Sequence, residues 1–100
     1  MKLKSPTITS NRMRPANPLH PGQMLLHEFL LPAGITQRAF ARRIGWTTAK
    51  LNELIAGKRG VTADSALDLS RTLNTSAELW LNLQMYWDLA RAQERRKKAS

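Results

Sequence analysis

The sequence predicts an all-α domain of five helices, the last of them long, in which the second and third helices form a helix-turn-helix. Two observations favour this fold. Apolar residues recur at the three- and four-residue spacing of amphipathic helices, and Gly, Pro or Thr stands at the expected helix boundaries. No segment shows the alternating pattern of a strand. With 100 residues and 42% hydrophobic side chains, we expect one modest core and a single globular domain.

The first helix is expected from Pro21 to about Leu31. Proline suits the first position of a helix, because the N–H that it lacks would have no partner there. Pro32 should end this helix, because a proline ring clashes with the preceding turn, and Gly34 should turn the chain.

The second helix is expected at residues 37 to about 44. Thr36 can cap its N-terminus and Gly45 breaks it. Its buried face would consist of apolar residues at helical spacing: Phe40, Ala41 and Ile44.

The third helix follows after a short turn. Thr47 can cap it, and it should run to about Ala56 before Gly57 ends it. The inward-facing residues would be Leu51, Leu54 and Ile55. These two short helices and the turn between them make up the predicted helix-turn-helix.

Two further helices complete the domain. Thr62 caps a fourth, with Asp64 at the positive end of its dipole. Its core face would be Ala66, Leu69 and Leu73. A fifth begins at Thr75, followed three residues later by Glu78 in the pattern of a capping box, and runs to about Lys97.

Positive charge dominates the chain and is concentrated in the helix-turn-helix. Sixteen Lys and Arg face seven Asp and Glu, which gives a formal net charge of +9. Residues 36–60 hold six basic side chains against Glu53 alone. A polyanionic partner is expected, either nucleic acid or an anionic membrane surface.

The chain divides into three regions. Residues 1–19 are basic, polar and rich in proline, and we expect a flexible N-terminal arm. We expect residues 20–92 to form a helix-turn-helix, DNA-binding and dimerisation domain, for the reasons given below, and residues 93–100 to form a basic C-terminal tail. The arm is either a disordered leader or a segment that binds the minor groove or a partner. The tail is either a solvated helix end or an extra contact to DNA or to a protein partner.

Several functional classes find no support in the sequence. The absence of cysteine excludes disulfides, thiolate metal sites and cysteine nucleophiles. No apolar run suits a membrane span or a secretory signal, so we expect a soluble, cytoplasmic protein with no membrane partner. His20 and His27 lack a third ligand, and Asp64 and Ser65 are explained by helix capping. We therefore expect no metal, no cofactor and no enzymatic activity.

The helix-turn-helix presents polar side chains where DNA would lie. In this motif the second helix enters the major groove by its N-terminal end. Thr47, Thr48 and Lys50 occupy the leading turn of that helix, where they can reach base edges, and Asn52 and Glu53 lie further along.

Phosphate contacts are expected on either side of that helix. Gln37 and Arg38 stand at the start of the preceding helix, where free backbone N–H groups favour a phosphate oxygen. Lys58 and Arg59 lie in the following loop, beside the flanking phosphates. Paired amphipathic helices also occur in proteins that do not bind DNA, but the basic residues and the spacing of Gly45 and Gly57 favour DNA binding.

Three segments resemble known regulators. Thr36-Gln37, Gly45, Leu51 and Gly57-Lys58-Arg59 resemble the helix-turn-helix of phage-repressor-like, or XRE-type, proteins. HPGQMLLHEFLLPAGIT at residues 20–36 and ELWLNLQMYWDL at residues 78–89 resemble the start and end of HigA-type antitoxins, the family also called virulence-associated protein I. The resemblance extends over about residues 15–92.

This resemblance implies a function. It implies a homodimer that binds palindromic operator DNA in its own promoter and neutralises a small HigB-like toxin, a ribosome-dependent mRNA endonuclease encoded beside it. The base-facing residues it implies are Thr48, Ala49, Lys50 and Glu53, with Gln37 and Thr47 nearer the backbone. Ala49 is shorter than the polar residue that other repressors place there, which favours methyl contact with thymine.

The fifth helix is apolar around most of its circumference, which predicts a second contact surface. We expect dimerisation, maintained directly or through the core by Trp80, Leu83 and Trp87. A wholly intramolecular core helix is the alternative.

Two other functions remain open. One is a free-standing repressor without a toxin. The other is an RNA-binding module, which should place aromatic stacking residues among the bases, where Trp46 is the one aromatic side chain of the turn and the third helix.

Overall fold

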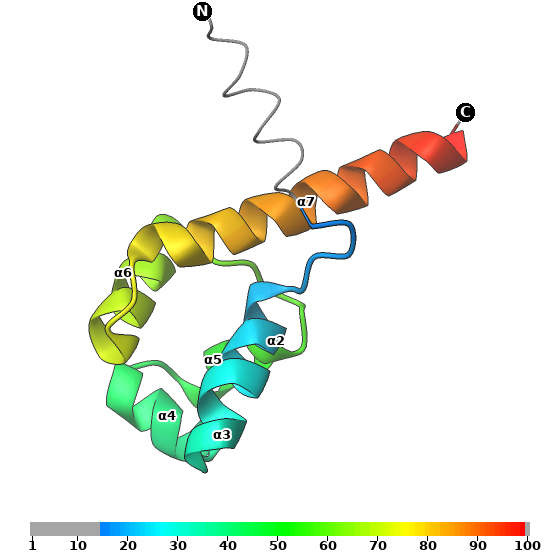
Figure 1. The fold of residues 1–100 in the computed structure, drawn as a ribbon. Coiled ribbons are helices and arrows are strands. Elements are labelled where there is room, and N and C mark those ends of the chain that lie inside the picture. The colour runs from blue at the N-terminus through cyan, green and yellow to red at the C-terminus, as the bar shows by residue number, and fades with distance from the viewer. Residues whose placement is uncertain (1–14, 100) are drawn as a thin grey trace, which may run out of the picture.

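The computed structural model describes residues 15–99, which form an all-α fold (Figure 1). The elements are α2 (Pro21–Leu25), the π-helical turn η1 (Leu26–Leu30), α3 (Leu31–Ala33), α4 (Gln37–Ile44), α5 (Thr48–Ile55), α6 (Ala63–Leu73) and α7 (Ala77–Ala99). Since α2, η1 and α3 follow one another without a break, the predicted five helices are confirmed within the described range. Most of the expected N-terminal arm, residues 1–14, lies outside it. None of the described helices is long and apolar enough to span a bilayer.

The first helix continues past Pro32, so its predicted end near Leu31 is wrong. The Leu31 N–H donates to the Leu26 carbonyl five residues earlier, which is the wide spacing of a π turn. A proline ring clashes with the preceding turn of a regular α-helix, and a wider turn opens the space that the ring needs. The helix therefore reaches Ala33 and ends at Gly34, whose φ of 67° is left-handed.

The helix-turn-helix forms as predicted. The Thr36 hydroxyl accepts from the Ala39 N–H at 3.1 Å, and the Thr47 hydroxyl accepts from the Lys50 N–H at 3.0 Å. Gly45, with a φ of 82°, separates α4 from the turn. The predicted inward residues of both helices are buried: Phe40, Ala41, Ile44, Leu51, Leu54 and Ile55.

Helix α6 begins at the predicted cap, and α7 does not. The Thr62 hydroxyl accepts from the Ser65 N–H at 3.2 Å. The predicted capping box is wrong, because the Ser76 hydroxyl accepts from the Leu79 N–H at 3.1 Å and so caps α7. The Thr75 hydroxyl instead accepts from the Trp80 indole N–H at 2.8 Å.

The core joins α2 tightly to the C-terminal end of α5. A Cβ atom on Gly22 would lie 1.9 Å from the Leu54 carbonyl oxygen, so only glycine permits this approach. The Gln23 amide also donates to the Ile55 carbonyl at 2.9 Å. This contact fixes the C-terminal end of α5 and leaves its N-terminal end at the surface, where Thr47, Thr48 and Ala49 are exposed.

Helix α7 packs on α6 and α2 through its first half. Figure 1 shows its second half extending beyond the other helices, on the side of the molecule away from α3 and α4. It continues to Ala99, two residues beyond the predicted end near Lys97, so the residues expected as a basic tail are helical as far as Ala99.

Candidate nucleic-acid interface

Helix α5 has one buried face and one exposed face. Its apolar residues pack inward, at less than a tenth exposed. The opposite side, called here the recognition face, carries exposed side chains that are small or polar: Thr48, Ala49, Asn52 and Glu53. Because the helix begins at the exposed Thr47 cap, the leading turn of this face is open to a ligand.

Lys50 lies at the edge of the recognition face and is half-buried. Its ammonium nitrogen lies over the Trp46 ring, 4.4 Å from the ring centroid. A lysine over an indole face makes a cation–π contact. The Lys50 side chain therefore extends toward the N-terminal end of α5, where it contacts Trp46 in the absence of a ligand.

Trp46 belongs to the core, with 9% of its surface exposed. Its indole N–H donates to Asp68 Oδ2 of α6 at 2.9 Å. This hydrogen bond is the main reason that the pKa of Asp68 lies below its usual value; slight burial opposes the shift, and Arg71 and Lys50 add to it. The ring is covered by Lys50 and the core, so it lacks the open face that base stacking in the RNA-binding alternative requires.

Glu53 and Arg59 form an ion pair at the surface. Arg59 Nη2 and Nε both donate to Glu53 Oε1, at 2.8 and 3.1 Å. Both side chains remain nearly half exposed. Arg59, which the sequence assigned to a flanking phosphate, thus pairs with an acid on the recognition face. Lys58 is exposed in the same loop, and its backbone N–H donates to the Glu53 carbonyl at 2.8 Å.

Helix α4 adds cationic side chains. Gln37 is half-buried and Arg38 exposed at its N-terminus, where they were predicted. Arg42 and Arg43 are also exposed, and within residues 15–99 none of these three arginines has a hydrogen-bonding or ion-pair partner. The sequence placed Arg42 and Arg43 in the basic segment but not in the site. Their position outside the buried face of α4 could have identified them.

Comparison with known proteins gives the family. The helix-turn-helix family model HTH_3 matches residues 26–80. Virulence-associated protein I of Dichelobacter nodosus is 38% identical over 76 residues, which are 76% of this chain and 70% of that protein. Antitoxin HigA-1 of Vibrio cholerae is 42% identical over 73 residues, covering 72% of this chain and 68% of that protein. The chain belongs to the HigA-type helix-turn-helix family.

A solved structure agrees with this assignment. The antitoxin HigA of Pseudomonas aeruginosa, solved with the higBA promoter, superposes with a TM-score of 0.77 at 37% identity, covering 83% of this chain and 90% of that one. The resemblance inferred from the sequence is confirmed. In this HigA-type chain α4 and α5 are the two helices of the helix-turn-helix, since the family match spans both.

The exposed face of α7 in this HigA-type chain carries three large apolar side chains beside the polar Glu78, Asn82 and Asp88. Leu81, Met85 and Leu89 recur every fourth residue and are 37%, 46% and 38% exposed, and we call them the apolar stripe. The residues expected to maintain a dimer face the other way: Trp80 is fully buried, Leu83 packs against the core and Trp87 is half-buried. Because Trp80 is fully buried within its own chain, it has no surface with which to contact another protein directly.

The two histidines have separate structural roles. His20 caps α2, its Nδ1 accepting from the Gly22 N–H at 3.0 Å, and its ring meets the edge of Trp87 with 5.3 Å between centroids. His27 is exposed and contacts the Gln23 amide oxygen at 3.1 Å. Among the described residues, no group of three potential ligands gathers to hold a metal ion.

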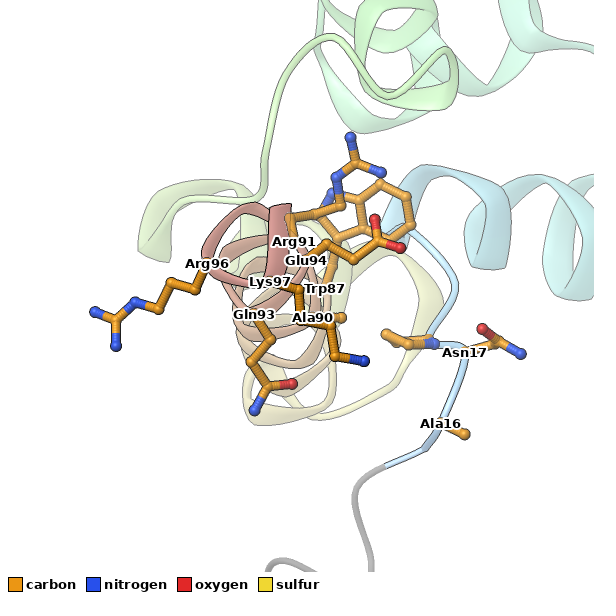
Figure 2. Close-up of a pocket in the computed structure, with 10 residues that line it drawn as sticks. Ala16, Asn17, Trp87, Ala90, Arg91, Gln93, Glu94, Arg96 and Lys97 are labelled. Carbon is orange, nitrogen blue, oxygen red and sulfur yellow. The ribbon is translucent and has the colours of Figure 1, made fainter. Parts of the chain in front are cut away.

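A groove of about 850 Å³ lies beside α7 and includes no residue of the recognition face. Figure 2 shows it between the chain at Ala16 and Asn17 and the second half of α7, where the Arg91 guanidinium lies over Trp87. That guanidinium is 5.4 Å from the ring centroid. The groove borders α7 and touches no residue of α4 or α5.

Proposed function

We propose that this chain is the antitoxin of a HigBA-type pair: it binds operator DNA as a homodimer, represses its own operon and neutralises a HigB-like mRNA endonuclease toxin. The observation that carries the proposal is the capped, exposed leading turn of α5 in a chain of the HigA-type family. The relative solved with its promoter supports the DNA-binding part. The proposal assigns no catalytic step to this chain.

The recognition face would read bases in the major groove. Helix α5 would enter by its N-terminal end, as the second helix of this motif does. Thr48 offers a hydroxyl and a methyl group, Ala49 offers a methyl group to thymine, and Lys50 can donate to guanine O6 and N7 from the edge of the face. Asn52 and Glu53 lie one turn further along α5.

The surrounding polar groups would hold the phosphates. Gln37 and Arg38 stand at the N-terminus of α4, where backbone N–H groups favour an anion. Thr47 and Lys58 lie at the two ends of α5, beside the expected path of the duplex backbone. Arg59 would share its charge between a phosphate and Glu53, its partner in the free protein.

The homodimer would form through the apolar stripe. Monomeric proteins rarely expose a contiguous row of large apolar side chains, and a second copy of α7 would cover it. Trp80, Leu83 and Trp87 would support this interface from within, because they pack the opposite face of α7.

Titration of operator variants tests the DNA-binding part. Wild type and Lys50→Ala are each titrated with duplexes from the region upstream of the gene. Circular dichroism checks that both proteins remain helical. The substitution should cost about 1 to 3 kcal/mol on the cognate operator and relax preference at one base pair of each half-site. An equal loss on all sequences would make Lys50 a phosphate contact and leave base reading to the recognition face.

Co-purification tests the toxin part. When the gene is expressed together with its neighbour from the native unit, the chain should retain a small basic protein through purification. Binding of that protein should survive Lys50→Ala, since the groove-facing surface need not be the toxin surface. If no such reading frame adjoins the gene, the chain is a free-standing XRE-type repressor.

A further inference from the structure

Trp46 and Asp68 connect Lys50 to α6 in one series of contacts. The Lys50 ammonium lies 4.4 Å from the centroid of the Trp46 ring. The Trp46 indole N–H donates to Asp68 Oδ2 at 2.9 Å, across 22 positions of sequence. Asp68 Oδ1 also accepts from Arg71 Nη2 at 3.3 Å. Lys50 of α5 is thereby connected to a carboxylate on α6.

Each of these contacts strengthens the next. Hydrogen bonds polarise one another, so a carboxylate at the indole N–H makes the ring more electron-rich, and an electron-rich ring face attracts a cation more strongly. The Asp68 charge also attracts Lys50 directly. Trp46 is 9% exposed and packed in the core, so the ring cannot turn away. Lys50 therefore rests on a fixed support.

A supported lysine makes a different DNA contact from a mobile one. A lysine side chain has many rotamers, and a DNA contact must remove that freedom. The Cα–Cβ bonds of a helix tilt toward its N-terminus, so Lys50 extends toward the leading end of α5, which would enter the groove. Because the contact with Trp46 already restricts the Lys50 side chain in the free protein, DNA binding has less rotamer freedom to remove, and the ammonium group is held at one position.

We propose that Trp46 and Asp68 are positioning residues for operator discrimination: they hold Lys50 in its base-reading position although neither lies on the recognition face. This inference rests on the proposed function, and within it on the contact of Lys50 with a base.

The test measures how strongly the protein discriminates between base pairs of the operator. A residue with a merely structural role would not change this discrimination at one base pair alone. Wild type, Lys50→Ala, Asp68→Asn and Trp46→Phe are titrated against operator duplexes with single base-pair changes. Asp68→Asn keeps an oxygen that accepts from the indole and removes the charge, while Trp46→Phe keeps a ring face and removes the N–H. Both should lose about two- to fivefold of discrimination at the base pair that Lys50→Ala relaxes, the size of an exposed cation–π contact.

Two comparisons isolate the effect. In a Lys50→Ala background, Asp68→Asn and Trp46→Phe should have no further effect at that base pair, because the residue they position is gone. Asp64→Asn makes the same chemical change on α6 at an exposed site outside this series of contacts, so discrimination should be unchanged. Should Trp46→Phe lose helicity, Asp68→Asn decides alone, because its side chain retains the acceptor.

The outcomes separate the inference from the function beneath it. If Lys50→Ala relaxes discrimination while Asp68→Asn leaves it intact, the inference is wrong and DNA reading by Lys50 stands. Tighter operator binding by Asp68→Asn would also overturn it, because Trp46 would then withhold Lys50 from DNA. If Lys50→Ala leaves the base-pair preference unchanged, Lys50 does not contact a base, and Trp46 and Asp68 cannot position it for that role.

Discussion

Helices α5 and α7 bury one face each in the same core, but their exposed faces differ in chemistry. The recognition face of α5 is small or polar, and the preceding helix α4 of the same helix-turn-helix carries exposed arginines. The exposed face of α7 carries the apolar stripe. A polar face beside cations suits a hydrated polyanion, whereas a row of large apolar side chains suits another protein surface.

This difference would allow one small core to support the two proposed contacts, one with DNA and one with a second copy of the chain. The inner faces of both helices contribute to stability, so changes there should unfold the chain. The outer faces contribute little to the stability of one subunit, so changes there should alter binding and leave the fold intact. Each of the following predictions tests one face of one helix.

The largest effect is expected at the inner face of α5. Gly22→Ala places a methyl group 1.9 Å from the Leu54 carbonyl oxygen, and backbone cannot move aside as a flexible side chain can. We expect a loss of about 3 kcal/mol in the free energy of unfolding, measured by urea denaturation. Gly34→Ala is the control: nothing lies within 4 Å, so only its left-handed φ of 67° matters, at about 1 kcal/mol. Equal losses would show that α2 and α5 do not pack this closely.

Where helix boundaries depend on neighbouring residues, the sequence predicted them well. Thr36, Thr47 and Thr62 accept from backbone N–H groups three residues later, as their positions indicated. The failures involve side chains that meet from further away. Thr75 is not the cap of α7, because that helix begins at Ala77 with the Ser76 hydroxyl as its cap, and the Thr75 hydroxyl accepts from the Trp80 indole instead. Pro32 did not end its helix, because the backbone widened instead of breaking.

The candidate site was predicted as a set of residues but not as a set of contacts. The Trp46 ring lies under Lys50, and its indole N–H donates to Asp68 on another helix. No local pattern in the sequence reveals that Trp46 and Asp68 meet. Arg59 returns to Glu53 because Gly57, with a φ of 78°, reverses the chain between them. The contact of Trp46 with Asp68 arises from tertiary packing and that of Arg59 with Glu53 from the turn at Gly57, and the spacing of residues encodes neither.

The outer face of α7 should control assembly. Met85→Glu puts a charge in the middle of the apolar stripe, and burying it without a partner should weaken dimerisation by about 2 kcal/mol, roughly thirtyfold. Light scattering at micromolar concentration should show a shift toward the monomer mass with helicity retained. Met85→Leu preserves the apolar surface and should leave the mass unchanged. A wild-type chain that is monomeric at this concentration would contradict the stripe as a dimer contact.

A smaller effect on DNA binding is expected in the loop that follows α5, where Lys58 is exposed. Lys58→Ala should weaken specific and non-specific duplexes alike, because a phosphate contact carries no sequence information. The slope of the logarithm of the binding constant against the logarithm of salt concentration should fall by about 1 in magnitude, as expected for one fewer phosphate contact. Lys98→Ala removes the same charge from the basic tail: an unchanged slope would make the tail a solvated helix end, and a smaller slope would make it an extra DNA contact. A loss confined to one operator sequence would show that Lys58 reads bases.

The smallest effect is expected at the inner face of α7, where His20 meets Trp87. Burial lowers the pKa of His20 below its ordinary value of 6.5, and the nearby Asp88 only partly opposes this shift. The folded state therefore disfavours the protonated ring, whose Nδ1 could no longer accept from the Gly22 N–H. Well above pH 6.5 both folded and unfolded chains are neutral at this residue, so its contribution to stability is fully present.

As the pH falls below 6.5 the unfolded chain binds the proton first, and the free energy of unfolding should decrease until the pH passes the lowered pKa of the folded state. Urea midpoints measured between about pH 5 and 8 would record this decrease, in a range where the carboxylates stay largely ionised. His20→Asn keeps a side chain that can cap α2 and removes the titration, so its midpoint should depend less on pH than that of wild type. If both proteins lose stability in parallel, another group is responsible, and the packing of His20 between α2 and α7 does not depend on its charge.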